Sequence, residues 1–406
     1  MKLPSMRWNT LAGVGTVSAL PGVAGSVVTV LLALSAVWAL ILLLLRRFPP
    51  RYQRSDLTIV VPALLFVFVT LLAALLEWRP DRDSSQLLSR LPAFLPFVFF
   101  PLVLSRLRTV EPVDVVKIFV LGASLCGILA LPLAVIQVVW LGERAEGGAG
   151  NAIPFGMVCA FFASISLLNL VETDARRQAL GWLGFVSATI CVLLSQSRGV
   201  LPIPVVAFVC FFWLYPAQRA WLFTPKVLVA FALALVSILL VASQQMDRMW
   251  LLAESVLGAS EGVQDNSLNL RLMMWKHATV LIGQDPWFGY GLQNRRTLLN
   301  ELGLTFSHFH NGFLTATVDS GVAGLAATVL LIVSPLLCVW HNPSSVLRRE
   351  RLFMAIMLTV TYILGGMTNF IFLHDIYDSV FLWSALIVAV PLAAPPAREV
   401  EWGHGA

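Results

Sequence analysis

Apolar segments long enough to cross a membrane alternate with short polar loops from Val23 to Leu392. A helix needs about 20 apolar residues to cross the hydrocarbon core of a bilayer. Prolines interrupt two of the shorter segments, and spanning helices tolerate proline where neighbouring groups satisfy the freed carbonyls. The pattern predicts eleven spans, at residues 23–45, 57–76, 90–105, 113–140, 151–171, 179–196, 199–215, 226–243, 311–340, 352–371 and 377–394.

The distribution of basic residues predicts one further span at the start of the chain. Cytoplasmic loops of membrane proteins carry an excess of Lys and Arg. The most basic loop, RRFPPRYQR at 46–54, becomes cytoplasmic if residues 8–22 also cross and Pro21 and Gly22 form the turn. The other basic loops then fall on the same side, which gives twelve spans with both termini inside. Eleven spans with an external amino terminus remain an alternative, and this topology preserves every orientation after residue 46.

This topology gives the outer face one long segment and several short loops. The long segment runs from about 244 to 309, within a chain that we interpret as a single membrane domain over 1–406. Asp265, Asn266 or Ser267 is predicted to cap a helix that ends near Ile282 and lies flat on the outer leaflet. The short outer loops are 79–86, 142–150, 195–199 and 373–378.

The composition supports a membrane protein and excludes other classes. The chain is 58% hydrophobic and 12% charged, whereas about a quarter of residues are charged in soluble domains. The net charge of +5 comes largely from short loops, where orientation explains it better than a nucleic-acid partner does. The five cysteines lie in apolar segments without CxxC spacing, so neither a disulfide framework nor a zinc site is predicted.

A polar cluster, SHFHNG at 307–312, precedes the apolar run of 311–340. On an ideal helix, Gly321 and Gly324 fall within about 40° of His310, so the three are predicted to share one face. Asp319 would point to the opposite face, which favours packing or a supporting role. His310 itself is either an interfacial histidine at a helix end or a group that accepts a proton near neutral pH.

Two arginines are predicted on the same outer side. Arg198 follows a span that holds no other charge, and Arg271 lies in the first turns of the surface helix. Each alone is explained equally well by contact with lipid headgroups. Together with His310 they suit a lipid diphosphate, because guanidinium groups bind phosphate oxygens in pairs.

Asp81 and Asp83 form a DxD pattern, which metal-dependent glycosyltransferases use to hold a divalent ion. Nearby Arg79, Arg82 and Arg90 compete for these carboxylates. We therefore interpret the segment as a solvated loop and predict no metal site.

Three stretches resemble the bacterial O-antigen ligase and polymerase superfamily. They are LLSQSRGVL (193–201), NLRLMMWKHATVLIGQDPWFGYGLQN (269–294) and HNGFLTATVDSGVAG (310–324). They resemble, in order, a serine-arginine-glycine turn, an arginine-bearing helix followed by a D-P-x-x-G-x-G turn, and an H-N, nine residues, G-x-x-G signature. The resemblance covers roughly 185–335, and the order and spacing of the motifs are more specific than any one motif.

The resemblance implies an all-α, GT-C-like bundle in the bacterial inner membrane with an active site that faces the periplasm. It implies a metal-independent, inverting glycosyltransferase without a cofactor, which uses a glycan linked to undecaprenyl diphosphate and works among membrane lipids. His310 matches the residue proposed as general base, and Arg198 and Arg271 match the arginines thought to hold the diphosphate. Asn311, Gly321 and Gly324 belong to the signature, whereas His308 precedes it and has no assigned role.

We predict an O-antigen ligase, which transfers the glycan to a sugar hydroxyl of lipid A-core. A polymerase, which extends another carrier-linked glycan, is the alternative within the same class. A lipid or sugar transporter would be expected to show paired charges deep in several spans and repeated halves. A peptidoglycan polymerase would be expected to place an acidic catalytic residue in the long outer loop, where this chain offers His310 and arginines.

Overall fold

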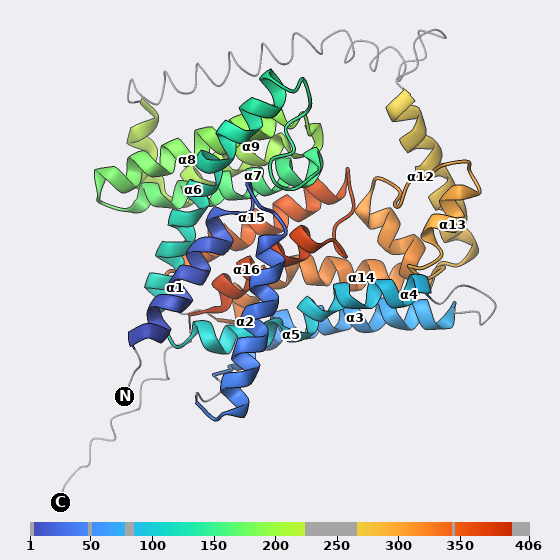
Figure 1. Cartoon of the computed structure of the whole chain (residues 1–406), viewed down its shortest axis with the longest axis horizontal. Coiled ribbons are helices and arrows are strands. Elements are labelled where there is room, and N and C mark those ends of the chain that lie inside the picture. The colour runs from blue at the N-terminus through green and yellow to red at the C-terminus, as the bar shows by residue number, and fades with distance from the viewer. Residues whose placement is uncertain (1–3, 48–50, 78–84, 224–265, 343–345, 392–406) are drawn as a thin grey trace, which may run out of the picture.

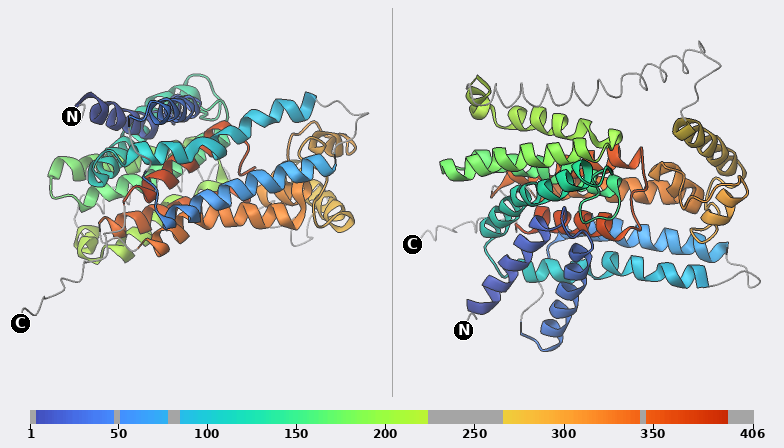
Figure 2. Two further views of the ribbon diagram at one scale, coloured as in Figure 1. Left: turned by 90° about the horizontal axis from the view of Figure 1, so that it is seen from below. Right: turned by 45° about the horizontal axis from the view of Figure 1, so that its top comes forward.

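The computed structural model describes residues 4–47, 51–77, 85–223, 266–342 and 346–391. Within these ranges every regular element is a helix (Figures 1 and 2). Seven helical segments among the described residues are long and apolar enough to cross a membrane. The chain is therefore a multi-pass membrane protein. The helices at the predicted spans 8–22, 199–215, 352–371 and 377–394 are not among these seven, and the span predicted at 226–243 lies outside the described residues. The total of twelve spans therefore stays a prediction.

The helices agree closely with the apolar segments of the sequence. The first half contains α1 (Pro4–Ala19), α2 (Val27–Leu44), α3 (Leu57–Leu76), α4 (Ser85–Arg90), α5 (Leu95–Leu107), α6 (Pro112–Val139) and α7 (Ala152–Ser166). The second half contains α8 (Ala175–Leu194), α9 (Pro202–Leu214), α12 (Asn266–Gln284), α13 (Arg295–Asn300), α14 (Gly312–His341), α15 (Arg348–Gly366) and α16 (Asp375–Ala389). Short 3-10 segments lie at Arg54–Asp56, Leu91–Phe94, Leu167–Val171, Arg198–Val200 and Pro216–Phe223.

Helix α1 lies along α6 and runs parallel to it (Figure 1). A Cβ built on Gly15 would meet Ile118, and one built on Gly122 would meet Ser18. Further along, Gly22 approaches Cys126. The contacts advance together along both helices, as expected if residues 8–22 cross in the same direction as α6.

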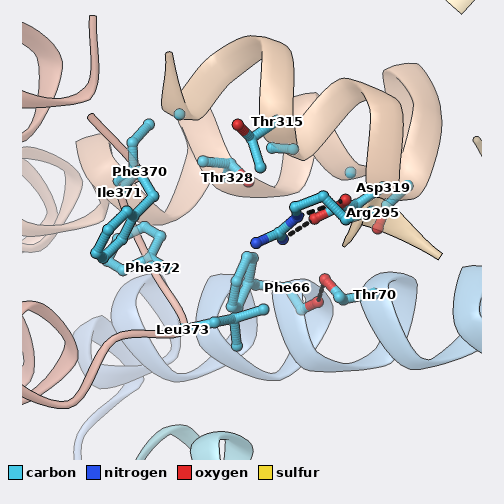
Figure 3. A pocket seen from close by; sticks show the side chains of 14 residues that line it. Phe66, Thr70, Arg295, Thr315, Asp319, Thr328, Phe370, Ile371, Phe372 and Leu373 are labelled. Atoms are coloured by element: carbon cyan, nitrogen blue, oxygen red, sulfur yellow. Dashed lines mark hydrogen bonds and ion pairs between the residues drawn. The ribbon is translucent and has the colours of Figure 1, made fainter. Parts of the chain in front are cut away.

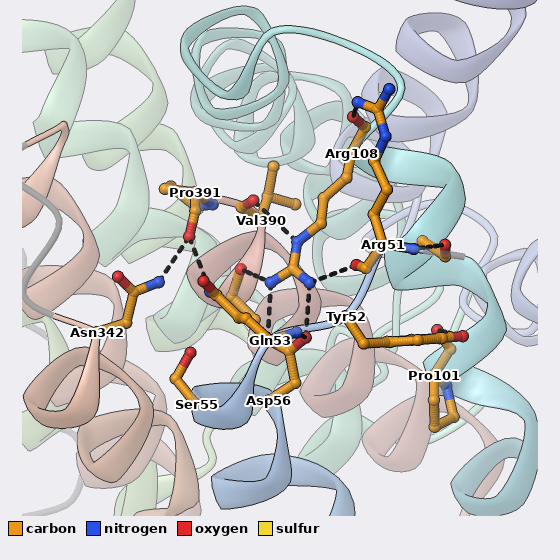
Figure 4. A network of polar contacts seen from close by, with 12 residues as sticks. Arg51, Tyr52, Gln53, Ser55, Asp56, Pro101, Arg108, Asn342, Val390 and Pro391 are labelled. Carbon is orange, nitrogen blue, oxygen red and sulfur yellow. Dashed lines mark hydrogen bonds and ion pairs between the residues drawn. The ribbon is translucent and has the colours of Figure 1, made fainter. Parts of the chain in front are cut away.

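Several basic loops that are predicted to be cytoplasmic meet at one end of the bundle, which we call the basic end (Figure 4). The buried guanidinium of Arg108 contacts both carboxylate oxygens of Asp56, at 2.6 and 2.7 Å. It also donates to the carbonyl oxygens of Arg51, Ala389 and Val390. This network joins three segments far apart in the sequence around one buried cation.

Segments that contain or adjoin predicted outer loops also contact one another, at what we call the site end: residues 20–26, 140–151, 195–199, 286–311 and 367–375. The Gly25 amide donates to the Gly148 carbonyl at 3.2 Å. The Ser26 hydroxyl donates to Asp375 at 2.8 Å. Gly199 lies against Thr368 so closely that a Cβ would be 2.3 Å from its side chain. The alternation of loops between the two ends therefore agrees with the order of the predicted spans.

Helix α14 is interrupted, although its apolar run reads as one continuous helix. Ser320 has φ −141° and ψ 17°, and Gly321 has φ 64° and ψ −164°. The turn at 286–291 is bonded into this break: the Tyr290 amide donates to the Val318 carbonyl at 2.8 Å, and the Val322 amide donates to the Pro286 carbonyl at 2.7 Å. The turn after α12 thus replaces hydrogen bonds that the break removes from α14.

Candidate active site

His310 lies immediately outside α14 in an uncommon backbone conformation. Asn311 caps the helix, because its side-chain oxygen accepts hydrogen bonds from the amides of Phe313 and Leu314 at 3.0 and 3.1 Å. His310 has φ 49°, which few residues other than glycine adopt. Its ring centroid lies 5.1 Å from that of Phe306 and 4.4 Å from that of His308. The cap and the contacts between rings fix where the imidazole stands.

Residues 306–311, which carry His308 and His310 and which we call the histidine loop, pack against α12, the helix that carries Arg271. The Trp275 indole nitrogen donates to the Phe309 carbonyl at 3.0 Å. Phe309 is fully buried against the face of α12 that carries Met274 and Ala278. Arg271 lies one turn before Trp275 on the same helix, so the anchored loop and the arginine are held together. Leu272, on another face of α12, is 49% exposed.

The surroundings of His310 favour its neutral form. Burial lowers the pKa of the imidazole, and the positive charge of Arg271 lowers it further. The Nδ1 atom is buried and has no hydrogen-bond partner among the described residues. A neutral imidazole is able to accept a proton at neutral pH.

Arg144, which the sequence analysis did not single out, joins the two expected arginines. Its Nε and Nη2 donate to the Ser195 carbonyl at 3.0 and 2.8 Å, so it is fixed to the turn that carries Arg198. Burial lowers the pKa of Arg144; Glu146 opposes this, and the charges of Arg198 and Arg271 lower the pKa further. The charges of Arg198 and Arg271, on two other segments, thus both act on the Arg144 guanidinium. The only sequence signal was that Arg144 is the sole cation in the outer loop 142–150.

His308 lies deeper than His310 and is a weaker base. Burial, followed by the charges of His310 and Arg295, lowers its pKa to about 3. Its Nδ1 lies 3.2 Å from the Ser307 hydroxyl, and its ring packs on Phe370 with centroids 4.8 Å apart. His308 thus stays neutral and packs between His310 and the loop that joins α15 to α16.

Asp319 pairs with Arg295, which was also missed in the sequence (Figure 3). The Arg295 Nε donates to one carboxylate oxygen at 2.9 Å, and Nη2 contacts the other. Arg295 Nη1 reaches the Ser307 carbonyl at 3.4 Å. Arg295 therefore links Asp319 to the backbone of the loop that contains His308 and His310.

The prediction that His310, Gly321 and Gly324 share one helical face is wrong. His310 precedes the helix, and the break at Ser320 and Gly321 interrupts the helical phase between them. Gly321 instead allows the backbone of Trp287 to approach, and Gly324 packs near the Ser320 side chain. Gly321 therefore serves the turn at 286–291, which we call the docked turn, whereas Gly324 packs within α14.

No metal centre is evident in the part of the chain that the structure describes. No group of three His, Cys, Asp or Glu side chains is arranged to hold an ion there. Asp81 and Asp83 lie outside the described residues, so the structure places neither carboxylate.

Comparison with known proteins agrees with the motifs. Residues 183–329 match the family model described as O-Antigen ligase. The match over this region supports membership of the O-antigen ligase superfamily. The matched region contains Arg198, Arg271 and His310, whereas Arg144 precedes it. An uncharacterized protein of Haemophilus influenzae (strain ATCC 51907 / DSM 11121 / KW20 / Rd) is 24% identical over 309 residues, which cover 70% of this chain and 73% of that protein.

Proposed function

We propose that the protein is an O-antigen ligase that transfers a glycan from undecaprenyl diphosphate to a sugar hydroxyl of lipid A-core. The observation that carries this proposal is the convergence of Arg144, Arg198 and Arg271 beside a neutral His310. The site end then faces the periplasm, with the bundle in the bacterial inner membrane, and the lipid-linked donor reaches it from the bilayer.

The arginines would hold the diphosphate of the donor. Neither Arg144 nor Arg271 forms an ion pair with any described residue. Guanidinium groups bind phosphate oxygens in pairs, and their charge compensates the negative charge that grows on the leaving diphosphate. This charge is larger in the transition state than in the bound donor, so the arginines accelerate the reaction. They supply the positive charge that a metal ion supplies in other glycosyltransferases.

His310 would act as the general base. The neutral imidazole accepts the proton of the acceptor hydroxyl while the oxygen attacks the anomeric carbon. The bond from that carbon to the phosphate oxygen breaks, and its electron pair leaves with undecaprenyl diphosphate. Attack opposite the leaving group inverts the configuration of the anomeric carbon.

A transfer assay tests the proposal. Purified protein in a chelating buffer is incubated with a glycan on undecaprenyl diphosphate and with lipid A-core, and mass spectrometry follows both lipids. We expect lipid A-core to gain the mass of the glycan. Growth of the carrier-linked glycan alone would identify a polymerase, and no mass change on either lipid would contradict both activities.

His310→Ala tests the role of the base in the same assay. We expect this variant to insert and fold but to lose transfer. His341→Ala is the matched control, since His341 is an exposed histidine at the basic end, and we expect it to keep full activity. Normal transfer by His310→Ala would refute the role of His310 as base.

A further inference from the structure

A second group of arginines lines an open pocket near the histidine loop, which we call the Arg296 pocket. Its cavity volume is about 210 Å³. Its lining consists of Ser89, Arg90, Leu292, Gln293, Arg295, Arg296 and Ser307. Leu292 is the sole apolar residue in this lining, so the pocket is suited to a polar ligand rather than to a lipid chain.

The residues that line the pocket include three arginines and no carboxylate. Asp319 neutralises Arg295. Arg90 and Arg296 are exposed, and neither forms an ion pair with a residue that the structure describes. Two exposed arginines beside a paired third favour an anionic ligand, because guanidinium groups bind phosphate or carboxylate in a planar, paired geometry.

A short series of contacts connects this pocket to His310. Arg295 donates to the Ser307 carbonyl at 3.4 Å, and the Ser307 hydroxyl lies 3.2 Å from His308 Nδ1. The rings of His308 and His310 are 4.4 Å apart. The pocket therefore adjoins the histidine that would deprotonate the acceptor, and its lining contains none of the three arginines assigned to the donor.

The side-chain amide of Gln293 offers a hydrogen-bond acceptor for a sugar hydroxyl. Its side-chain nitrogen donates to the Ala74 carbonyl at 3.0 Å, which fixes the amide. Its side-chain oxygen is buried without a partner among the described residues. A buried acceptor of this kind gains free energy from a hydroxyl donor, and sugar hydroxyls supply such donors.

We propose that the Arg296 pocket binds a phosphate or carboxylate group carried by the acceptor saccharide. This rests on the proposed function, because it divides the site between two substrates. Arg144, Arg198 and Arg271 hold the donor diphosphate, and Arg90 and Arg296 hold the anionic group of the acceptor. Binding there places an acceptor hydroxyl at His310 and makes an anionic acceptor preferred over a neutral one.

The test compares Arg90→Gln/Arg296→Gln with Arg176→Gln/Arg348→Gln, which removes the same charge from exposed sites remote from the site end. Each protein is placed in phosphatidylcholine nanodiscs, so that no anionic lipid competes. Calorimetry measures the affinity for core oligosaccharide released from lipopolysaccharide, in three forms: untreated, dephosphorylated and carboxyl-reduced. Transfer assays on the same variants give KM for the acceptor and for the donor.

We expect the Arg90→Gln/Arg296→Gln variant to bind untreated core about five to ten times more weakly, since an exposed ion pair contributes up to about 1 kcal/mol. Its KM for the acceptor should rise while KM for the donor stays unchanged. The treated core that loses affinity for the wild-type protein identifies phosphate or carboxylate as the ligand. Equal affinity of all three proteins for all three forms would overturn the proposal.

The measurements of acceptor affinity and KM distinguish a failure of the pocket proposal from a failure of the proposed ligase activity. Transfer to lipid A-core with an unchanged KM for the acceptor in the double variant would refute the pocket and leave the ligase intact. Arginine-dependent binding of core without any transfer would support the pocket and refute the ligase.

Discussion

Gly321 packs against the backbone of Trp287 at a distance that no other residue type allows. A Cβ on Gly321 would lie 2.1 Å from the carbonyl carbon and oxygen of Trp287. The break in α14 and the turn at 286–291 are therefore one unit. Because the same turn joins α12 to α13, this unit connects the helix that carries Arg271 with the helix that begins just after His310.

Gly321→Ala should disrupt this unit. Its backbone lies in a region of φ and ψ that is essentially restricted to glycine, and a Cβ would also clash with a backbone that cannot move aside. We expect a loss of stability of about 1–3 kcal/mol or more and a strong loss of transfer. Thermal unfolding in detergent and the transfer assay measure the two effects.

Gly283→Ala in α12 is the matched control for this substitution. A Cβ there meets nothing within 4 Å. Alanine has a higher helix propensity than glycine, so the variant should be as stable as the wild type or more stable by up to about 1 kcal/mol. If both alanine variants unfolded like the wild type, Gly321 would not be required by the docked turn.

The break in α14 shows why part of this fold could not be predicted from the chain pattern. The segment 311–340 is largely apolar and fits a single long helix, and the observed bounds of α14 agree with it. The break depends on hydrogen bonds from residues 286–291, about thirty residues earlier in the sequence. Helical periodicity contains no information about such a partner. The G-x-x-G motif coincides with the position of the break but does not predict that the helix is interrupted there.

The ion pair between Arg295 and Asp319 leads to a prediction about stability. Both side chains are largely buried, with 14% and 5% exposure. Asp319→Asn removes one partner and leaves a buried guanidinium without its counter-charge, which costs about 3–5 kcal/mol for a fully buried pair. We expect a somewhat smaller loss here, because Arg295 is partly exposed.

A double-mutant cycle isolates this interaction. Asp319→Asn/Arg295→Gln removes both charges, so thermal unfolding should show it to be more stable than Asp319→Asn alone. Losses that simply add in the double variant would mean that the pair contributes no coupling energy.

Loss of a carboxylate from the network at the basic end should reduce the stability of the protein more than loss of Asp319 does. Arg108 and Asp56 are buried, and Arg108 donates to both carboxylate oxygens and to three carbonyls. Asp56→Ala leaves the cation uncompensated, so we expect a loss of about 3–5 kcal/mol in unfolding measurements. Asp114→Ala removes a carboxylate from the exposed pair with Arg7 and should change stability by less than about 1 kcal/mol. Similar losses in both variants would contradict a special role for the Arg108 network.

Substitution of Arg198 by lysine tests whether the arginines act through the planar geometry of the guanidinium group as well as through its charge. Arg198→Lys keeps the charge, but an ammonium group does not bind two phosphate oxygens in the paired manner of a guanidinium. We expect kcat/KM for the donor to fall about 10²-fold to 10³-fold, the range seen when one transition-state donor is removed. Arg176→Lys is the control, and we expect no change. A wild-type rate in Arg198→Lys would show that charge alone is sufficient.

The candidate site was only partly visible in the sequence. His310, Arg198 and Arg271 stand in motifs with recognisable spacing. Arg144 and Arg295 do not, because their positions follow from the tertiary contacts with Ser195 and Asp319. A lone arginine in a polar loop gives no local pattern, so sequence reasoning finds such residues only when the fold shows what they contact.

The pH dependence of transfer tests the pairing of His310 with Arg271. A base with a lowered pKa stays neutral to lower pH, so kcat/KM should fall on the acid side only below the ordinary histidine pKa of about 6.5. Burial lowers this pKa most, and Arg271→Gln removes the charge that lowers it further, so the acid limb should move part of the way up towards 6.5 as the maximal rate falls. Lys276→Gln removes an exposed charge from the same helix and should leave the limb in place. If the limb of Arg271→Gln coincided with that of the wild type, the charge of Arg271 would not act on the base, and the proposed arrangement of the site would be wrong.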